Sequence, residues 1–458
     1  MKISSIIFAS SLALAGSASA AMTWVHPGAL DSKAELDFVK AKIAAGAEPW
    51  TSQLAKMKDA DGGLLKVATP EVNMLSQANE ALSRDDARRA YGNALDWYYT
   101  GDVAAANRAI AILNAWTVLQ SINYGSDQSK LEAGWVGSLF GPAAEIMLGY
   151  SGWQAADIEK VRAMFKRAFY PVLNTASTWN GNVDLHQISA MMAIAVFNED
   201  ETEFNLAVTR LAARMPRYFY LTTDATPTQD SWFSPAQWLN GLTQETCRDN
   251  NHHSQFGMSG AFGAMETAWH QGVDLYSTYQ TRMVAVEELM ALQSFSGSMQ
   301  GACSNNAASA DVYATWEIGY NHLHNRKGIA MPNTKAMIEG KVRSVNSNGG
   351  SWSIFYETLT HAEVGGSGTV GMANKPAQST MPASVLLRKG MCEIFANKAA
   401  TYQITTLGLN GSMVNQASLP MAAGSSKLIS LGLEGAPAGI YMVQVRSSAG
   451  IMAFKYIK

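Results

Sequence analysis

Apolar residues recur every three or four positions along most of the chain, from residue 32 to about residue 345. The spacing is clearest in two runs: Ile158, Val161, Phe165 and Phe169, then Phe204, Val208, Leu211 and Met215. This period places apolar side chains on one face of a helix, and the alternation that marks a strand is scarce over the same stretch. The pattern therefore predicts a region that is nearly all helix.

Short turns such as Thr100-Gly-Asp102 and Tyr124-Gly-Ser126 separate the predicted helices. Ser32, followed by Glu35, forms a capping box at the start of the first helix. Further helices are expected over three ranges: Tyr91–Tyr99, Ala104–Trp116 and Leu131–Tyr150. Many helices with short connections pack as antiparallel hairpins that close into a toroid or a solenoid. Since no fixed-period repeat is visible, we expect a mainly α protein with an (α/α) toroid over residues 21–364.

The pattern changes after this region. Gly365-Gly-Ser-Gly368 through Pro376 and Pro382 is small, polar and rich in helix breakers, which indicates a linker over residues 365–384. Short β runs follow at five places: Val385–Leu387, Tyr402–Thr406, Leu428–Leu431, Ile440–Val445 and Ala453–Ile457. Turns such as Asn410-Gly411 separate them, so residues 385–458 are predicted to form a small β-sandwich.

The composition allows a large core and excludes some partners. The chain has 458 residues, of which 47% are hydrophobic and 16% are charged, and its net charge is −3. Its length favours two or three domains. Because there is no polybasic run, nucleic acid is not expected as a partner, and an anionic partner must be held by local Arg, Lys, His and amide groups.

The first twenty residues have the pattern of a secretory signal peptide. Lys2 precedes an apolar run from Ile6 to Ala15, and Ala18-Ser19-Ala20 offers a small-residue cleavage site. No later segment is apolar for long enough to span a membrane. We therefore expect residues 1–20 to be removed and the protein to be secreted or held at the cell surface after passing through the periplasm.

Three cysteines, Cys247, Cys303 and Cys392, allow at most one disulfide within the chain. Their spacing is not that of a metal site. Cys247 stands beside Arg248 and could be a nucleophile, but the sequence around it lacks a thiolate-activating signature, so a buried or paired cysteine is favoured.

One stretch carries an unusual density of chemical groups: Glu245-Thr-Cys-Arg-Asp-Asn-Asn-His-His-Ser-Gln-Phe-Gly257. Arg248 offers a planar fork that suits a carboxylate or a phosphate. His252 and His253 can hold or move a proton near neutral pH. The small and apolar residues that follow indicate a tightly packed helix, so the cluster is expected where that helix begins, at one end of the toroid. The alternative is a polar helix start with capping Asn and Asp.

Several segments of the helical region resemble the alginate lyase superfamily of polysaccharide lyases, most closely polysaccharide lyase family 38 and more distantly family 5. The segments are Trp97-Tyr-Tyr-Thr-Gly-Asp102, Asn114-Ala-Trp116, Trp179-Asn-Gly-Asn182, the stretch from Glu245 to Gly257, Ala268-Trp-His-Gln-Gly-Val-Asp-Leu-Tyr276 and Trp316-Glu-Ile-Gly-Tyr-Asn-His322. The resemblance implies an (α/α) toroid that splits a 4-linked polyuronate, alginate or β-1,4-glucuronan, by β-elimination without a cofactor or a metal.

The C-terminal region has a second resemblance. Gly439-Ile-Tyr-Met-Val-Gln-Val445 and the terminal Lys455-Tyr-Ile-Lys458 look like the sorting domain of type IX secretion substrates. This resemblance implies the outer-membrane secretion machinery as a partner, in addition to an anionic polysaccharide substrate.

Such a lyase must remove the C5 proton of a uronate whose carboxylate keeps its charge, so it needs groups that offset this charge, a base at C5 and an acid at O4. The resemblance assigns Asn182 and Arg248 as neutralisers and His253 as base or neutraliser. The family 5 histidine after the Asn is Val183 here, and the family 5 tyrosine seven residues after the Arg is Gln255. Tyr320 is therefore the expected base and acid, in a syn elimination if it serves both positions and an anti elimination if it shares them with His253.

Substrate binding is expected at Trp179, His252, Gln255 and His322. Other readings stay open. Asn182 could cap a helix, Tyr320 could be a half-buried aromatic, and His186 fits a packed helix face. Four imidazoles, His252, His253, His322 and His324, could suggest a metal, but their spacing is not typical of zinc.

Two other functions are also open. A glycoside hydrolase on the same toroid would need two carboxylates, with Asp249, Glu245 and Glu317 available. A protein that binds polyuronate without cleaving it is the third possibility.

Overall fold

The computed structural model describes residues 22–59, 64–75, 80–227, 232–344, 352–364 and 383–458, the last range with gaps at 389, 397, 409–411, 424, 438 and 449. The chain divides into two compact units, Met1–Val370 and Gly371–Lys458. The predicted signal peptide and residues 365–382 of the predicted linker lie outside the described residues. Within the described ranges, no helix has both the length and the apolar character needed to cross a membrane.

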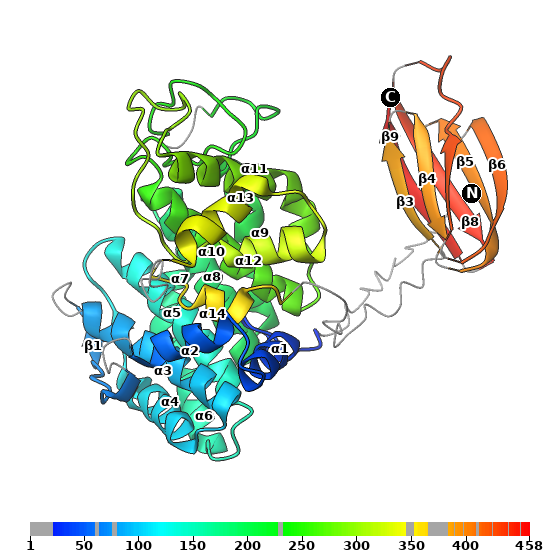
Figure 1. The fold of residues 1–458 in the computed structure, drawn as a ribbon. Helices are drawn as coiled ribbons and strands as arrows, with labels where there is room; N and C mark the ends of the chain where they lie inside the picture. The colour runs from blue at the N-terminus through cyan, green and yellow to red at the C-terminus, as the bar shows by residue number, and fades with distance from the viewer. Residues whose placement is uncertain are drawn as a thin grey trace, which may run out of the picture. The chain divides into compact units, whose positions relative to one another are not determined.

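The first unit is helical, as expected (Figure 1). Its longer helices are α1 (Lys33–Ala44), α2 (Trp50–Asp59), α3 (Glu80–Thr100), α4 (Val103–Ala115), α5 (Gln128–Met147), α6 (Ala155–Met164), α8 (Gly181–Asn198), α9 (Glu201–Tyr218), α10 (His252–His270) and α11 (Leu275–Ser296). Shorter pieces are α7 (Tyr170–Leu173), α12 (Glu317–Tyr320), α13 (Pro332–Met337), α14 (Glu357–His361), and the turns η3 (Trp116–Val118), η4 (Phe165–Phe169), η5 (Asn321–Arg326) and η6 (Ile338–Val342). Two short strands, β1 (Asn73–Met74) and β2 (Ser121–Ile122), pair in parallel.

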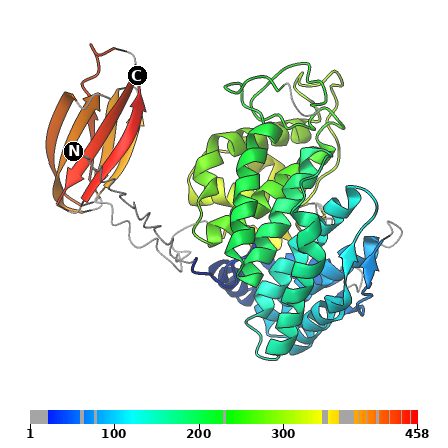
Figure 2. The ribbon, with the colours of Figure 1, turned by 180° about the vertical axis from the view of Figure 1, so that it is seen from behind.

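The helices form an inner and an outer layer. α3 packs on α5, α5 on α8 and α8 on α10, while α4 lies against α3 and α9 against α8. Seen from behind, the long helices run side by side (Figure 2). Every residue of α8 is buried, as expected for a helix without a polar face that lies between other helices. Close approach depends on glycines: a Cβ on Gly134 would lie 2.9 Å from the His186 backbone, and one on Gly260 would lie 2.8 Å from the Leu185 backbone. The arrangement is an (α/α) toroid, which confirms the predicted fold class.

The local sequence signals of the first helices are confirmed. The Ser32 hydroxyl accepts a hydrogen bond from the Glu35 backbone N–H, and the Glu35 side chain accepts one from the Ser32 backbone N–H. The three further predicted helices lie within or overlap α3, α4 and α5. Their boundaries differ from the observed ones by one to three residues, except that α3 begins eleven residues before Tyr91.

The second unit is a β-sandwich. Its described residues form β3 (Ala383–Arg388), β4 (Met391–Ala396), β5 (Ala400–Gly408), β6 (Met413–Met421), β7 (Ser426–Ser430), β8 (Ile440–Ser447) and β9 (Gly450–Ile457). One antiparallel sheet has the order β3-β4-β7 and the other β6-β5-β8-β9. Ile394 of the first sheet and Tyr402 and Val443 of the second belong to one core. β4 and β6 are additions to the five predicted strands.

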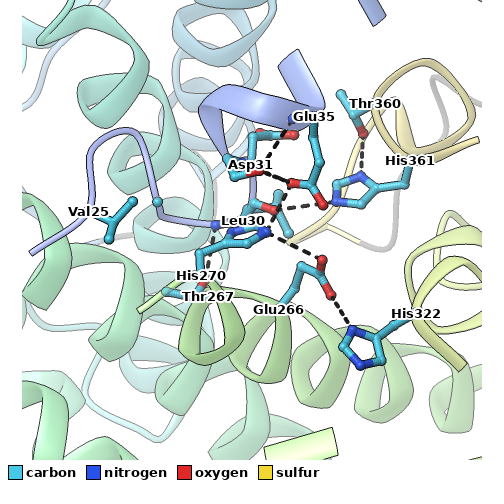
Figure 3. Close-up of polar contacts among 12 residues, drawn as sticks. Val25, Leu30, Asp31, Glu35, Glu266, Thr267, His270, His322, Thr360 and His361 are labelled. Atoms are coloured by element: carbon cyan, nitrogen blue, oxygen red, sulfur yellow. Dashed lines mark hydrogen bonds and ion pairs between the residues drawn. The ribbon is translucent and has the colours of Figure 1, made fainter. Parts of the chain in front are cut away.

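A buried charge cluster joins three parts of the toroid. It consists of Glu35 from α1, Glu266 and His270 from α10, and Arg326 at the end of η5. Figure 3 shows the side chains of Glu35, Glu266 and His270 pointing toward one another. The His270 Nε2 lies 2.9 Å from Glu35, Arg326 Nη1 lies 2.6 Å from Glu266, and a second nitrogen of Arg326 donates to Glu35. Two carboxylates thus meet two cationic groups in the protein interior.

The electrostatics of this cluster favour the charged state of its members. Burial alone raises the pKa of Glu35, but His270 and Arg326 outweigh burial and lower it to about 2. Burial alone lowers the pKa of His270, yet the two carboxylates raise it to about 10. The cluster therefore holds four charges that balance one another at neutral pH.

Candidate active site

The chemically dense stretch leads into α10, as the sequence predicts. Asn250 and Asn251 have positive φ angles of 54° and 78°, a conformation that Asn adopts more readily than most residues. The turn they make brings Asp249 back over the start of the helix, where its Oδ1 accepts a hydrogen bond from the His253 backbone N–H at 3.0 Å. The groups of this stretch consequently lie at one end of an inner helix.

Glu245 is the centre of the site. Its carboxylate is fully buried and accepts three hydrogen bonds: from Asn182 Nδ2 at 2.6 Å, from the Tyr218 hydroxyl at 2.8 Å and from Arg248 Nη1 at 2.7 Å. Asn182 is also buried, so its amide nitrogen holds Glu245, whereas the Arg248 side chain keeps 33% exposure. In the sequence, Glu245 is a candidate only for the acid of a hydrolase, and nothing there distinguishes Tyr218. The carboxylate instead fixes the orientation of the guanidinium.

His253 is held by Asp249. Its Nδ1 forms a short hydrogen bond with Asp249 Oδ2, and both side chains are 29% exposed. Burial raises the pKa of Asp249, but the hydrogen bonds from the His253 side chain and backbone outweigh burial and lower it. Since the carboxylate is the acceptor, Nδ1 carries the proton and Nε2 has the free lone pair. Asp249 thus orients the His253 ring so that Nε2 can act as a base.

His252 forms a second pair with the loop after α11. Its Nδ1 lies 2.5 Å from Asp311 Oδ2, and the Tyr313 hydroxyl lies 3.3 Å from the same nitrogen. The Tyr313 ring packs on Phe256 with 4.7 Å between centroids. Burial, followed by Asp311 and Asp249, raises the pKa of Tyr313 to about 12, so its phenol keeps its proton at neutral pH. Tyr313 was not among the predicted site residues, because nothing in the local sequence distinguishes it from other loop tyrosines.

Gln255 holds the loop that follows α11. It is fully buried, its Nε2 donates to the Asp311 carbonyl at 3.1 Å, and its Oε1 accepts from the Tyr313 backbone N–H at 3.1 Å. These bonds fix the loop that carries Asp311 and Tyr313. The predicted substrate contact of Gln255 is therefore replaced by a contact with this loop.

A cavity of about 550 Å³ lies beside the two histidines. It is lined by Asp249, Asn250, His252, His253, Asn305, Ala307, Ala308, Ser309 and Asp311. Its far wall belongs to the loop that follows α11, and a disulfide between Cys247 and Cys303 ties this loop to the stretch before α10. Of the two states that the sequence favoured for Cys247, buried or paired, the structure has the paired one, and the disulfide joins the two segments that form the cavity.

Aromatic and cationic groups lie near His186, one turn after Asn182 on α8. The Arg84 guanidinium lies 5.0 Å from the Trp135 ring centre and 4.6 Å from that of Trp352, and Trp352 is exposed. The Trp135 ring is 6.1 Å from that of His186. Burial lowers the pKa of His186 to about 3, so His186 is a neutral packed residue, as the sequence suggested. Trp179, predicted to bind substrate, is 47% exposed just before α8.

The structure does not bring Tyr320 and His322 to this site. Tyr320 lies in α12 and lines a different cavity with residues of α1, η5, α13 and η6. Across the described ranges no hydrogen bond, ion pair or ring contact joins it to Asn182, Arg248 or His253. His322 is fully buried, stacks on Tyr276 at 3.5 Å and accepts a hydrogen bond from Arg326 at 2.8 Å. Of the four catalytic residues expected in a single pocket, His253 lines the cavity, Asn182 and Arg248 are joined to each other through Glu245, and Tyr320 lies elsewhere. His322 is not accessible to a substrate.

The described residues contain one group that could hold a metal ion, Glu35, Glu266 and His270, with ligand atoms within 4.8 Å of one another. Arg326 already bonds both carboxylates, and its charge stands where a cation would be needed. These residues therefore do not fit a metal, and they belong to the buried charge cluster at the opposite end of α10.

The fold and the cleft define an (α/α) toroid with an oriented histidine, an arginine and a phenol at one end of an inner helix. A family model described as Alginate lyase matches residues 72–293, a range that includes Asn182, Arg248 and His253. No curated protein matches the chain in sequence.

Solved structures of alginate lyases share this fold. Alginate lyase A1-III from Sphingomonas species A1 is 14% identical, with a TM-score of 0.53, and the match covers 68% of this chain and 92% of that one. A variant of alginate lyase A1-III complexed with tetrasaccharide is 16% identical over 69% and 92% of the two chains, with a TM-score of 0.51. An alginate lyase from Bacteroides ovatus is 12% identical over 74% and 100%, with a TM-score of 0.50. At these identities the likeness concerns the fold.

Proposed function

We propose that this protein is a polysaccharide lyase that cleaves a 4-linked polyuronate, alginate or β-1,4-glucuronan, by β-elimination. One observation carries the proposal. The Arg248 guanidinium, held by the buried carboxylate of Glu245, lies four residues before two histidines that are each oriented by a carboxylate, at the open end of an inner helix. The match to the Alginate lyase family model and the fold of solved alginate lyases support it.

Arg248 is the group that offsets the charge of the substrate carboxylate. Glu245 accepts from one of its nitrogens, and the remaining N–H groups are free to donate to the uronate oxygens, on which negative charge grows as the C5 proton leaves. Asn182 and Tyr218 act through Glu245 and are positioning residues in this scheme. A guanidinium fixed in this way needs little rearrangement when the charge develops.

We assign the two proton transfers to two groups. His253 Nε2 accepts the C5 proton, with Asp249 stabilising the imidazolium that results. The C4–O4 bond breaks as the C4=C5 double bond forms, and the departing O4 receives the proton of the Tyr313 phenol, which its raised pKa preserves until that moment. This division of labour replaces the earlier assignment of Tyr320 and suits an anti elimination.

The test is incubation of the purified protein with a panel of polymannuronate, polyguluronate and β-1,4-glucuronan, followed by ultraviolet absorbance of the conjugated double bond. We expect one polymer to give this signal and Tyr313→Phe to lower the rate by about 10²–10⁴, the range for loss of a general acid. Tyr320→Phe is the matched control and should leave the rate near that of the parent. Absence of unsaturated product with every polymer contradicts the proposal.

The three carboxylates that the sequence offered to a glycoside hydrolase do not form a catalytic pair. Glu245 is fully buried and accepts three hydrogen bonds, and Glu317 is engaged by Arg343 at 2.9 Å and by the Thr358 hydroxyl at 2.6 Å. Of the three carboxylates that the sequence offered, only Asp249 reaches the cleft. A pair of catalytic carboxylates facing each other across a sugar is not available from this set.

We further propose that residues 1–20 direct export and that the β-sandwich serves as a sorting domain of the type IX secretion kind. The sequence of residues 1–20 and the terminal strands support this proposal. Mass spectrometry of the protein from its native cells tests it: an N-terminus near Ala21 is expected, together with loss or surface retention of residues 371–458. A cell-associated full-length chain with Met1 intact contradicts it.

A further inference from the structure

A second polar cavity lies in the toroid, around Tyr320. It has a volume of about 360 Å³, within the range of small-molecule sites. Its lining comes from α1, α12, η5, α13, η6 and the segment after α14: Phe38, Lys42, Tyr320, His324, Asn325, Lys335, Ile338, Glu339, Arg343 and Glu363. None of these residues lines the cleft beside His253. We call this feature the Tyr320 cavity.

Tyr320 gives the cavity a ring and a free hydroxyl. Its ring stacks on that of His324 with 4.6 Å between centroids and 22° between planes. In the described part of the chain the phenol has no hydrogen-bond partner, although the residue is only 9% exposed. Burial raises its pKa to about 12, so the hydroxyl stays a donor. A nearly buried donor that faces a cavity without a partner is a group that a ligand can satisfy.

His324 and Asn325 add acceptors beside this donor. The His324 Nδ1 lies 2.6 Å from the Ile329 carbonyl, so Nδ1 carries the proton and Nε2 is the acceptor. The Asn325 amide nitrogen donates to Asn321 Oδ1 at 3.1 Å, which leaves the Asn325 side-chain oxygen as an acceptor. Hydroxyl groups of a sugar can both donate to such acceptors and accept from the phenol.

The charges of the lining leave one cation without a carboxylate. Arg343 is paired with Glu317 and lies 3.8 Å from Glu363, and Lys335 is paired with Glu339. Lys42, by contrast, has no carboxylate within ion-pair distance among the described residues, and its ammonium lies over the rings of Phe38 at 5.1 Å and Trp50 at 4.9 Å. The cavity thus offers one uncompensated positive charge next to an aromatic face.

We propose that the Tyr320 cavity binds one uronate residue of an oligosaccharide, with Lys42 opposite the carboxylate and Tyr320, His324 and Asn325 at the hydroxyls. The choice of a uronate rests on the proposed function. A site of this kind, away from the cleft, holds a polymer or a released product on the enzyme without taking part in the elimination. Tyr320 is then a binding residue, and the cleft performs the chemistry.

Isothermal titration of the full chain with sodium glucuronate tests the site, with glucose as the uncharged probe. Lys42→Gln and Tyr320→Phe should each weaken one binding event about tenfold or more, because each removes a hydrogen bond or a charge-assisted contact. Lys40→Gln, an exposed lysine of the same helix, is the matched control and should titrate like the parent chain. The rate with a short polyuronate at saturation should be unchanged in all three variants.

Three results would overturn the inference. They are equal titrations for Lys42→Gln and Lys40→Gln, equal affinity of the site for glucose and glucuronate, and loss of turnover in Tyr320→Phe. The outcome is separable from that of the proposed function. If no polymer is cleaved but Lys42→Gln still loses glucuronate binding, the cavity assignment stands and the lyase assignment fails.

Discussion

The two ends of α10 carry the same kinds of side chain with opposite consequences. At its beginning, His253 pairs with Asp249 and Arg248 pairs with Glu245, and the His253, Asp249 and Arg248 side chains are about one third exposed. At its end, His270 and Arg326 meet two carboxylates, and the side chains of Glu35, Glu266 and His270 are at most 4% exposed. The residue types in a charged cluster therefore do not identify a functional site. The exposure of their side chains distinguishes such a site from a buried structural cluster.

The difference has an energetic basis. At the buried end each charge is satisfied within the cluster, and removing one partner leaves an uncompensated charge away from water. At the open end His253 and Asp249 line the cleft, and the Arg248 side chain stays one third exposed, so a substrate can replace solvent around these groups. Substitutions at the start of α10 should thus lower turnover with little effect on the free energy of unfolding. Substitutions at its end should lower the free energy of unfolding with little effect on turnover.

The largest expected effect is on turnover at the open end. His253→Gln keeps a hydrogen bond to Asp249 but removes the base, so the rate of elimination should fall by about 10³, within the usual range of 10²–10⁴. The melting temperature should stay within a few degrees of that of the parent. Steady-state rates and thermal unfolding of the same preparation measure both. A variant that retains most of its rate means that His253 does not take the C5 proton.

The next effect is on stability at the buried end. Arg326→Met removes the cation that bonds both Glu35 and Glu266, which should lower the free energy of unfolding by about 3–5 kcal/mol. Lys160→Met is the matched control, because its ion pair with Asp157 is exposed and worth at most about 1 kcal/mol. Urea unfolding gives both values.

The rate per folded molecule should be unchanged in Arg326→Met. If the rate falls and the stability does not, the buried charge cluster takes part in the chemistry, and the contrast between the two ends of α10 is lost.

The disulfide between Cys247 and Cys303 should affect both the free energy of unfolding and substrate binding at the start of α10. The double variant Cys247→Ser, Cys303→Ser should lose about 2–4 kcal/mol of unfolding free energy, and it should also raise KM because the loop with Asp311 and Tyr313 is no longer tied to the stretch before α10. Cys392→Ser, which removes the free cysteine of the β-sandwich, is the control and should leave KM unchanged. An unaltered KM in the double variant shows that Gln255 alone is sufficient to hold this loop.

The sequence was informative about the open end because an ordinary helix start does not require so many ionisable groups before a glycine-rich helix. It could not reveal Tyr313, which only the loop after α11 brings beside His252. It also could not show that Gln255 is turned inward to bind that loop, since a buried and a cleft-facing glutamine look alike in sequence.

The position of Tyr320 could not be predicted from the spacing of residues in the sequence, because it depends on the geometry of the helices around it. Thr315 still contacts the backbone of Gln255 near the open end, but Tyr320 follows more than a turn later and faces a cavity shared with α1.

The toroid itself was predictable, because its helical period persists over the whole region. In the β-sandwich, β6 was missed since most of its side chains are at least partly exposed, and alternation with a core is then weak.

The smallest expected effect is a pH dependence of stability that arises from the buried end. The pKa of His270 is raised from 6.5 to about 10, so its ion pairs stabilise the fold fully below about pH 6.5, and this contribution is lost as the pH rises through about 10. The pKa of Glu35 is lowered from 4.5 to about 2, so its contribution is present above about pH 4.5 and is lost as the pH falls toward 2. Stability measured by urea unfolding should therefore decline on the alkaline side, and His270→Gln should flatten that decline while His253→Gln leaves it unchanged. If both variants flatten it equally, the alkaline decline does not come from the buried charge cluster, and burial does not distinguish the two ends of the helix.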